Sequence, residues 1–152
     1  MRKLGRFSDR GQGKKSEEWF IAVKRASLDD GIFVIQEHFA RTHHFDFRLE
    51  REGVLKSWAL PKGVPEAEGV RRLAVEVEDH PLSYAGFSGT IPPGRYGAGE
   101  VRIWDRGVYR AEEWGTDKIA FVLRGERISG PFALIRLKRG GGRNWLLLRR
   151  KG

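Results

Sequence analysis

Hydrophobic and polar residues alternate along several short segments of this chain, as they do along the strands of a β-sheet with one buried face. The clearest case lies between His44 and Glu50, where Phe45, Phe47 and Leu49 alternate with polar or charged residues. Because successive side chains of a strand point to opposite faces, this strand should have one apolar and one polar face. Shorter or less regular segments predict further strands at 33–36, 54–60, 72–78, 100–104, 118–123, 132–137 and 144–149.

Clusters of turn residues separate these strands. Arg51-Glu52-Gly53 indicates a tight hairpin turn, and the glycine- and proline-rich segment 88–99 indicates a long loop. Further turns are expected at 105–107, 124–126 and 140–142. Many short strands joined by turns are typical of an antiparallel barrel or a closed sandwich. We predict a mainly β protein, a small antiparallel β-barrel with one or two short flanking helices.

The segment 72–78 alternates in the same way, which predicts one buried and one exposed face. The residues expected to point into the core are Leu73, Val75 and Val77. Those expected to point outward are Arg72, Glu76 and Glu78, with His80 on the same side.

A chain of 152 residues is long enough for one domain with its own hydrophobic core. Residues 1–17 are polar and basic, which predicts a flexible basic arm, and residues 18–152 are expected to form a single β-barrel domain. No apolar run approaches the roughly 20 residues that span a bilayer. The N-terminus also lacks the apolar segment of a secretory signal, so we predict a cytoplasmic protein. The sequence contains no cysteine, which leaves histidine and carboxylates as strong metal ligands.

The charge balance changes the picture of what the domain binds. Lysine and arginine together number 29 against 20 acidic residues, which gives a formal net charge of +9. A surplus of this size favours polyanionic partners, nucleic acid first and an anionic membrane surface second. The alternative is a surface charge that only keeps the protein in solution.

The polar face of the strand around His44 carries residues that can bind a metal ion. His44 and Asp46 are two residues apart, about 7 Å along an extended strand, and share that face. His38 lies six residues earlier, an even number, and residues 40–42 are expected to bend the chain and bring it closer. Two imidazoles and a carboxylate leave open positions on a divalent cation. The alternative is a polar strand face with ordinary surface histidines.

Other side chains in the same region are candidates for binding a phosphate. Arg48 lies on the same polar face and is placed to bind non-bridging oxygens. His80 is a candidate fourth metal ligand, general acid or hydrogen-bond donor, unless it merely ends its strand, and Tyr84 is a candidate donor to the same group. Lys62 and Arg72 are candidate phosphate-binding cations, although each can also be a solvated surface charge.

Three stretches of the sequence are long enough to point to a family. They read FVIQEHFARTHHFDFRLEREGVLKSWALPKG, RRLAVEVEDHPLSY and GTIPPGRYGAGEVRIWDRGVY. Together they closely resemble the phosphoesterase module of bacterial ATP-dependent DNA ligase D and its free-standing bacterial and archaeal relatives. The resemblance runs from about Phe33 to Tyr109 almost without gaps, and continues more loosely through GERISGPFALIR and NWLLLRR.

The resemblance implies a manganese-dependent DNA 3′-end healing enzyme built on a small β-barrel. Such an enzyme trims a 3′-terminal ribonucleotide to leave a 3′-phosphate, and then removes that phosphate to leave a 3′-hydroxyl. By matching position, the resemblance implies His38, His44 and Asp46 as metal ligands, Arg48, His80 and Tyr84 as contacts to the reactive phosphate, and Lys62 and Arg72 as supporting cations. The expected partners are DNA and a DNA ligase, and we expect a monomer. Because no side chain is an obvious nucleophile, we predict that water attacks.

Two segments depart from the family pattern. Relatives usually open with an Arg-Asp-Phe and Thr-x-Glu-Pro segment, where this chain has GRFSDRGQGKKSEEW, with Arg6, Arg10 and Glu17 as candidate equivalents. Many relatives carry glutamate at the position of Ser88. We therefore expect that one of the two reaction steps can differ in this protein.

Two other functions fit parts of the pattern. His44, Asp46 and His80 have the outline of the two-histidine, one-carboxylate site of non-haem iron oxygenases, although Arg48 and the positive charge favour a phosphate substrate. A non-catalytic nucleic-acid or ligase-binding module would also be basic, because phosphate contacts supply affinity without chemistry. Such a module predicts that His44→Ala leaves DNA affinity intact and that no divalent ion binds stoichiometrically.

Overall fold

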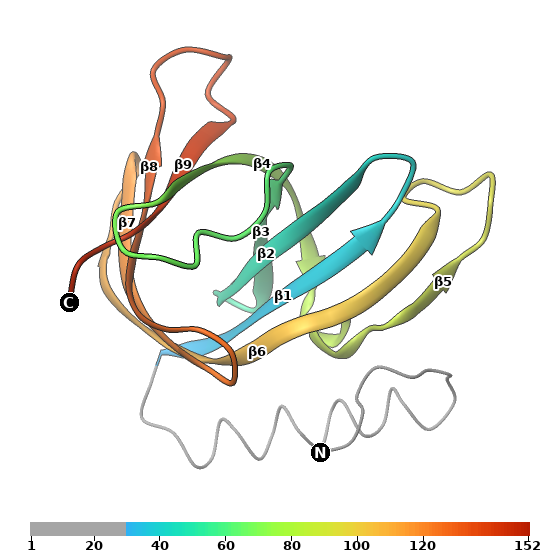
Figure 1. Cartoon of the computed structure of the whole chain (residues 1–152), viewed down its shortest axis with the longest axis horizontal. Coiled ribbons are helices and arrows are strands. Elements are labelled where there is room, and N and C mark those ends of the chain that lie inside the picture. The colour runs from blue at the N-terminus through green and yellow to red at the C-terminus, as the bar shows by residue number, and fades with distance from the viewer. Residues whose placement is uncertain (1–29) are drawn as a thin grey trace.

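Residues 30–152 are the part of the chain that this computed structural model describes, and they form nine strands and one short 3₁₀ helix (Figure 1). The predicted arm at 1–17, with Arg6, Arg10 and Glu17, and the predicted start of the domain at residue 18 lie outside this part. The strands are β1 (Gly31–Phe39), β2 (His43–Arg51), β3 (Val54–Leu60), β4 (Arg71–Pro81), β5 (Gly89–Ile91), β6 (Gly99–Trp114), β7 (Lys118–Gly125), β8 (Ser129–Arg136) and β9 (Asn144–Arg149), and the helix is η1 (Leu82–Gly86).

The strands pair in a ring. The order is β1-β2-β3-β4-β9-β8-β7-β6, and β6 pairs back with β1, so eight strands close into a barrel while β5 adds to the first residues of β6. Every pairing is antiparallel. The predicted small antiparallel β-barrel is confirmed, with η1 as the helix of the described residues. No helix within residues 30–152 is long and apolar enough to cross a membrane.

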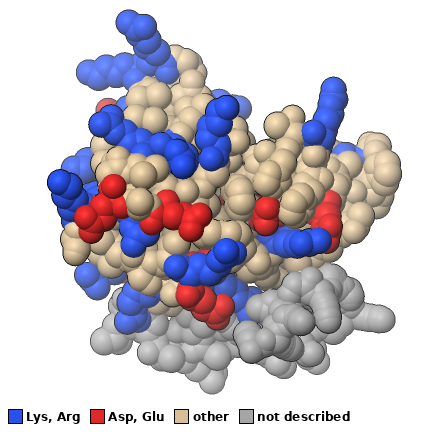
Figure 2. Space-filling view, viewed as in Figure 1, with Lys and Arg blue, Asp and Glu red and all other residues tan. Residues whose placement is uncertain are grey.

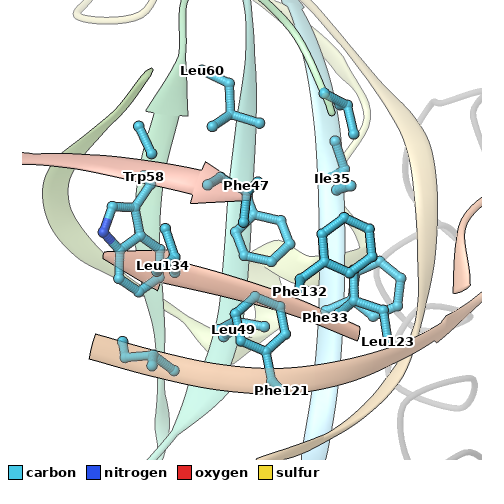
Figure 3. Packing of buried hydrophobic residues seen from close by; sticks show 14 of the residues in the cluster. Phe33, Ile35, Phe47, Leu49, Trp58, Leu60, Phe121, Leu123, Phe132 and Leu134 are labelled. Atoms are coloured by element: carbon cyan, nitrogen blue, oxygen red, sulfur yellow. The ribbon is translucent and has the colours of Figure 1, made fainter. Parts of the chain in front are cut away.

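The core lies on the inner side of the ring, where alternate residues of most strands meet. Phe33, Phe47 and Trp58 from neighbouring strands pack against Phe121 and Phe132 from the opposite side (Figure 3). These side chains are 0 or 1% exposed, which is the burial that the alternation of the β2 segment predicted for its apolar face. Burial of large aromatic and aliphatic side chains is the main stabilising contribution to such a barrel.

A second, smaller cluster lies on the other face of the same strands. Ile32 and Val34 of β1 pack there with Leu55, Ala85 and Val108. Ala85 belongs to η1, so this helix covers part of the polar face of β2. β1 is consequently buried on both faces, which explains why its first six residues form a continuous buried run.

The predicted turn at 105–107 is wrong, because β6 continues through it to Trp114. The register of β1 against β6 shifts between Ile35 and Gln36, and this bulge absorbs Trp104. The Asp105 carboxylate then accepts hydrogen bonds from backbone N–H groups of the β7–β8 turn, at 2.9 to 3.1 Å. Asp105 therefore stabilises a neighbouring turn, although it lies within a strand and not in a turn itself. The predicted loop at 88–99 also contains the short strand β5.

The predicted faces of β4 are inverted. Glu76 pairs with Trp58, whose side chain lies in the barrel core, and Ala74 also belongs to that core. The Glu76 carboxylate is accommodated there because Trp145 Nε1 donates a hydrogen bond to it at 3.0 Å. Val77, predicted to point into the core, instead lies opposite Ser57 on the outer face. A buried hydrogen-bond partner from a distant strand thus overrides the polarity pattern.

Replacing Gly107 with alanine is expected to destabilise the barrel by about 2 to 3 kcal/mol. A Cβ at this position would lie 2.0 Å from the Arg124 carbonyl oxygen, a backbone atom that cannot move aside without opening the β6–β7 pairing. The matched control is Gly115→Ala, whose Cβ would meet its nearest atom at 3.4 Å. Urea unfolding of the two variants checks this prediction, and equal midpoints would contradict it.

Candidate functional site

The three predicted metal ligands come together on two paired strands. His38 of β1 is directly opposite His44 of β2, and Gln36 is opposite Asp46. One Asp46 oxygen, Oδ2, lies 3.6 Å from His38 Nδ1 and 3.3 Å from His44 Nε2. All three ligand atoms lie within 4.8 Å of one another. The antiparallel pairing of β1 with β2 therefore brings the three ligand atoms together, which we had expected a bend at 40–42 to do.

Two backbone carbonyls set the direction of the imidazoles. His38 Nε2 lies 2.7 Å from the Gly97 oxygen, and His44 Nδ1 lies 3.0 Å from the Thr42 oxygen. A carbonyl oxygen only accepts hydrogen bonds, so these nitrogens carry the protons. The other ring nitrogens, His38 Nδ1 and His44 Nε2, face Asp46, where each offers a lone pair to a cation or, when protonated, a hydrogen bond to the carboxylate. Such outer hydrogen bonds are the usual means of fixing the tautomer of a metal-binding histidine.

The carboxylate between the imidazoles is ionised. Burial by itself would raise the pKa of Asp46, but hydrogen bonds from His38 and His44 and the charge of Arg48 hold it well below its ordinary value. The hydrogen bond to Asp46 raises the pKa of His44 above 6.5, against the opposing effect of burial. In the absence of a cation, His44 therefore binds a second proton more readily than a free imidazole does, because the Asp46 carboxylate favours a positive charge beside it.

These residues fit a divalent cation. Ligand atoms about 2.0 to 2.2 Å from one cation lie roughly 3.0 to 3.5 Å from each other, and both distances from Asp46 Oδ2 are close to this range. Two nitrogens and one carboxylate oxygen suit zinc, manganese or iron and leave positions open for a substrate. His38 and Asp46 are each 8% exposed, so the site is shielded from bulk water on the barrel side.

Metal affinity is expected to increase as the pH rises through the pKa of His44, which is raised above its ordinary value of 6.5. A metal ion binds the neutral imidazole, so the proton on His44 competes with it, and the raised pKa moves this competition to higher pH. Below the pKa, the apparent affinity should fall about tenfold per pH unit. Calorimetric titration with Mn²⁺ in two buffers of different ionisation enthalpy measures the released proton. An affinity that is constant from pH 6 to 8 would contradict the prediction.

Arg48 is held in place on every side. Its Nε donates to Gln36 Oε1 at 2.7 Å, and its Nη1 donates to Ser57 Oγ at 2.8 Å. Nη2 lies 3.7 Å from Asp46 Oδ2. The residue is 4% exposed, and the guanidinium stacks over the Tyr84 ring at 5.0 Å. A fixed positive charge therefore lies directly beside the candidate metal site.

Gln36 and Ser57 belong to the site and were not found from the sequence. Gln36 is fully buried, and its amide nitrogen donates to the carbonyl oxygens of Tyr84 and Phe87 at 2.9 and 3.1 Å. It thus connects Arg48 to the segment that carries Tyr84. The available signal was a polar residue at the end of the apolar run 33–36, and a buried amide requires hydrogen-bond partners.

A bulge brings His80 to the site. β3 and β4 shift register between Leu55 and Ser57, so that Lys56 faces two β4 residues and His80 returns to the face of Arg48. His80 Nδ1 lies 3.1 Å from Arg48 Nη1 and 3.1 Å from the Glu78 carbonyl oxygen. Burial, followed by the charge of Arg48, lowers the pKa of His80. Nδ1 can accept from Arg48 or donate to the Glu78 carbonyl oxygen, depending on the tautomer, and in the first case the ring proton lies on Nε2.

A pocket of about 270 Å³ joins these groups. The candidate metal ligands, the candidate phosphate contacts and the loop before β6 all line it. In chain order, these residues are His38, His44, Asp46, Arg48, His80, Tyr84, Tyr96 and Gly97. Within the described chain, Lys62 and Arg72 do not line it. Lys62 is exposed in the loop after β3, and Arg72 lies opposite Leu147 on the barrel side of β4.

The fold and the pocket define a class of protein: a β-barrel with a candidate site for a divalent cation beside a fixed cationic group for an anion. The comparisons with known proteins name the family. The profile of the DNA Ligase D 3′-phosphoesterase domain matches residues 36–136, and the chain belongs to this family.

The similar proteins are longer than this chain. The multifunctional non-homologous end joining protein LigD of Mycobacterium bovis is 47% identical over 153 residues, which cover 98% of this chain and 20% of that protein. LigD of Pseudomonas aeruginosa is 49% identical over 125 residues, which cover 78% of this chain and 15% of that protein. The chain thus spans about a fifth or less of the length of these relatives.

Proposed function

We propose that this protein is a divalent-metal-dependent phosphoesterase that heals 3′ ends of DNA for end joining. At a 3′-terminal ribonucleotide it would hydrolyse the bond between the phosphate and the O5′ of the last residue, which releases a ribonucleoside and leaves a 3′-phosphate, and it would then remove the phosphate to leave a 3′-hydroxyl. Family membership and the names of the relatives support the reaction class and DNA as the substrate. The observation that carries the proposal is the convergence of His38, His44 and Asp46 beside the buried Arg48.

His38 Nδ1, His44 Nε2 and Asp46 Oδ2 would hold the metal ion, which we propose to be Mn²⁺. A bound divalent cation lowers the pKa of water and withdraws charge from a phosphoryl oxygen. Arg48 uses Nε and Nη1 for Gln36 and Ser57, which leaves Nη2 beside Asp46 as the donor nearest the candidate metal site. The preorganised charge of Arg48 would stabilise the negative charge that develops on the phosphoryl group.

His80 and Tyr84 would complete the phosphate site as hydrogen-bond donors. The lowered pKa of His80 favours a neutral ring whose Nε2–H donates to the leaving oxygen. Burial raises the pKa of Tyr84, so its phenol keeps its proton and can donate as well. The two rings lie 4.9 Å apart, and both contact Arg48. We propose that stabilisation of the leaving oxygen is the contribution of His80.

The roles of the two outer cations follow their positions. Lys62 is exposed and would contact the DNA backbone beyond the pocket. Arg72 lies on the barrel side of β4, so the geometry does not support a direct contact between Arg72 and the reacting group.

We propose further that the protein acts as a monomer and delivers healed ends to a DNA ligase.

Incubation of the protein with a 5′-labelled primer-template that ends in one ribonucleotide tests the proposed function. With Mn²⁺, we expect shortening to a 3′-phosphate product and then conversion to a 3′-hydroxyl product; with a chelator, we expect no change. Release of phosphate in heavy-oxygen water should incorporate solvent oxygen, because no pocket side chain is an obvious nucleophile. An unchanged primer at all metal concentrations would indicate a module that binds nucleic acid without catalysis.

A further inference from the structure

A second pocket adjoins the first. It measures about 330 Å³ and is lined by Val77, Glu78, Tyr96 and Arg143, the first three of which also line the pocket with the candidate metal ligands. Its walls come from β4, the loop between β5 and β6, and the loop between β8 and β9. Figure 2 shows a hollow between the part of the molecule formed by the β8–β9 hairpin and the part that carries β5. A strand whose end occupies the first pocket can therefore continue into the second.

Tyr96 stands at the junction of the two pockets with its ring in solvent. It is 89% exposed, the highest value among the large hydrophobic side chains in the described part of the chain. Its neighbour Gly97 is held by the hydrogen bond from His38 and has a φ of 78°, so the loop is attached to a candidate metal ligand. An exposed aromatic ring contributes little to the fold, and a ring beside a phosphate site is suited to stack on a nucleobase.

The charges around the second pocket indicate where a phosphate can lie. Arg143 lines it, and the loop before Arg143 adds the exposed Lys138 and Arg139. Lys and Arg side chains gather over this hairpin at the upper left of Figure 2. Glu78 lies on the β4 side and disfavours a phosphate there. The uncharged base would therefore lie near Tyr96 and Glu78, and the backbone phosphate near Arg143.

We propose that Tyr96 and Arg143 form a subsite for the nucleotide that precedes the reacting 3′ end, with its base stacked on Tyr96 and a backbone phosphate bound by Arg143. This inference rests on the proposed function, because it takes the first pocket to hold the 3′-terminal group. Stacking on a π face accepts any base, so the subsite would recognise a nucleic acid strand without selecting its sequence. It would favour an oligonucleotide over a free nucleotide.

Binding without turnover tests the subsite independently of catalysis. A short single strand with a 5′ fluorophore and a 3′-phosphate is titrated with the full chain in chelator, either with all bases or with an abasic unit as the last nucleotide, the one that carries the 3′-phosphate. Removing the base is expected to weaken binding roughly tenfold in the unaltered protein. Tyr96→Ala should weaken binding of the intact strand by the same factor and lose nothing further with the abasic strand. Tyr96→Phe keeps the ring and should bind both strands like the unaltered protein.

Arg143→Ala should weaken both strands equally and reduce the dependence of affinity on salt, whereas Arg110→Ala, an exposed arginine remote from both pockets, should do neither. The proposal is overturned if Tyr96→Ala weakens both strands equally, or if the abasic unit has no effect on the unaltered protein. Metal-dependent processing that persists alongside those results would leave the proposed function standing. Stacking without any processing would reject the proposed function and retain the subsite.

Discussion

Replacement of Asp46 by asparagine is expected to abolish stoichiometric Mn²⁺ binding and to reduce 3′-end processing by at least about a thousandfold. The amide has nearly the same size, but it lacks the negative charge that faces His38, His44 and Arg48. Without that charge, two imidazoles and a nearby guanidinium would surround the cation site, and a divalent ion would be repelled. Calorimetric titration and initial rates with a 3′-phosphate strand measure the two effects.

His43→Ala is the matched control for the Asp46 variant. His43 is adjacent to a candidate ligand, but its Nε2 contacts Glu37 at 2.8 Å and its ring stacks on Phe39, so it takes no part in the metal cluster. This variant should bind one Mn²⁺ and process ends at the rate of the unaltered protein. If Asp46→Asn still bound one Mn²⁺ with undiminished affinity, the metal site would have to lie elsewhere.

Arg48→Lys is expected to lower kcat/KM by roughly a hundredfold to a thousandfold while metal binding is retained. A lysine keeps the charge, but one ammonium group cannot replace the planar fork that contacts Gln36, Ser57 and His80 at once. Loss of these donors should also destabilise the fold by about 1 to 3 kcal/mol, because Gln36 Oε1 would be buried without a partner. Rates must therefore be compared well below the melting temperature of the variant.

The control for Arg48 is Arg102→Lys, which changes an exposed arginine paired with Glu100 on the first part of β6. Because that arginine is outside the pocket lining, its replacement should leave the rate unchanged. A near-normal rate for Arg48→Lys, with the expected loss of stability, would show that the guanidinium fork serves the fold and that the reaction requires only a positive charge at this position.

The local parts of the fold followed from the sequence with good accuracy. The expected strands at 54–60 and 144–149 coincide with β3 and β9, and the expected hairpin turn has positive φ angles at Glu52 and Gly53. The polar face of β2 also brought His44, Asp46 and Arg48 together as expected. These features depend on the two-residue period of a strand and on turn residues, which are properties of neighbouring positions.

The failures share a different origin. Strand β6 passes through Asp105, and Glu76 points into the barrel, because each carboxylate finds hydrogen-bond donors on segments far away in the sequence. The loop that carries Tyr96 is likewise held by a contact between distant positions, the hydrogen bond from His38 to the Gly97 carbonyl oxygen. No pattern within a strand reports such partners.

The sequence by itself determined most of the strands, the apolar face of β2 and the candidate metal ligands His44 and Asp46 on its polar face, since these arise from short-range alternation and residue chemistry. Only the tertiary structure decided that His38 faces His44, that a bulge returns His80 to Arg48, and that Gln36 and Ser57 hold the guanidinium. Register, bulges and ring closure result from pairing between distant segments, whose energies no single segment contains.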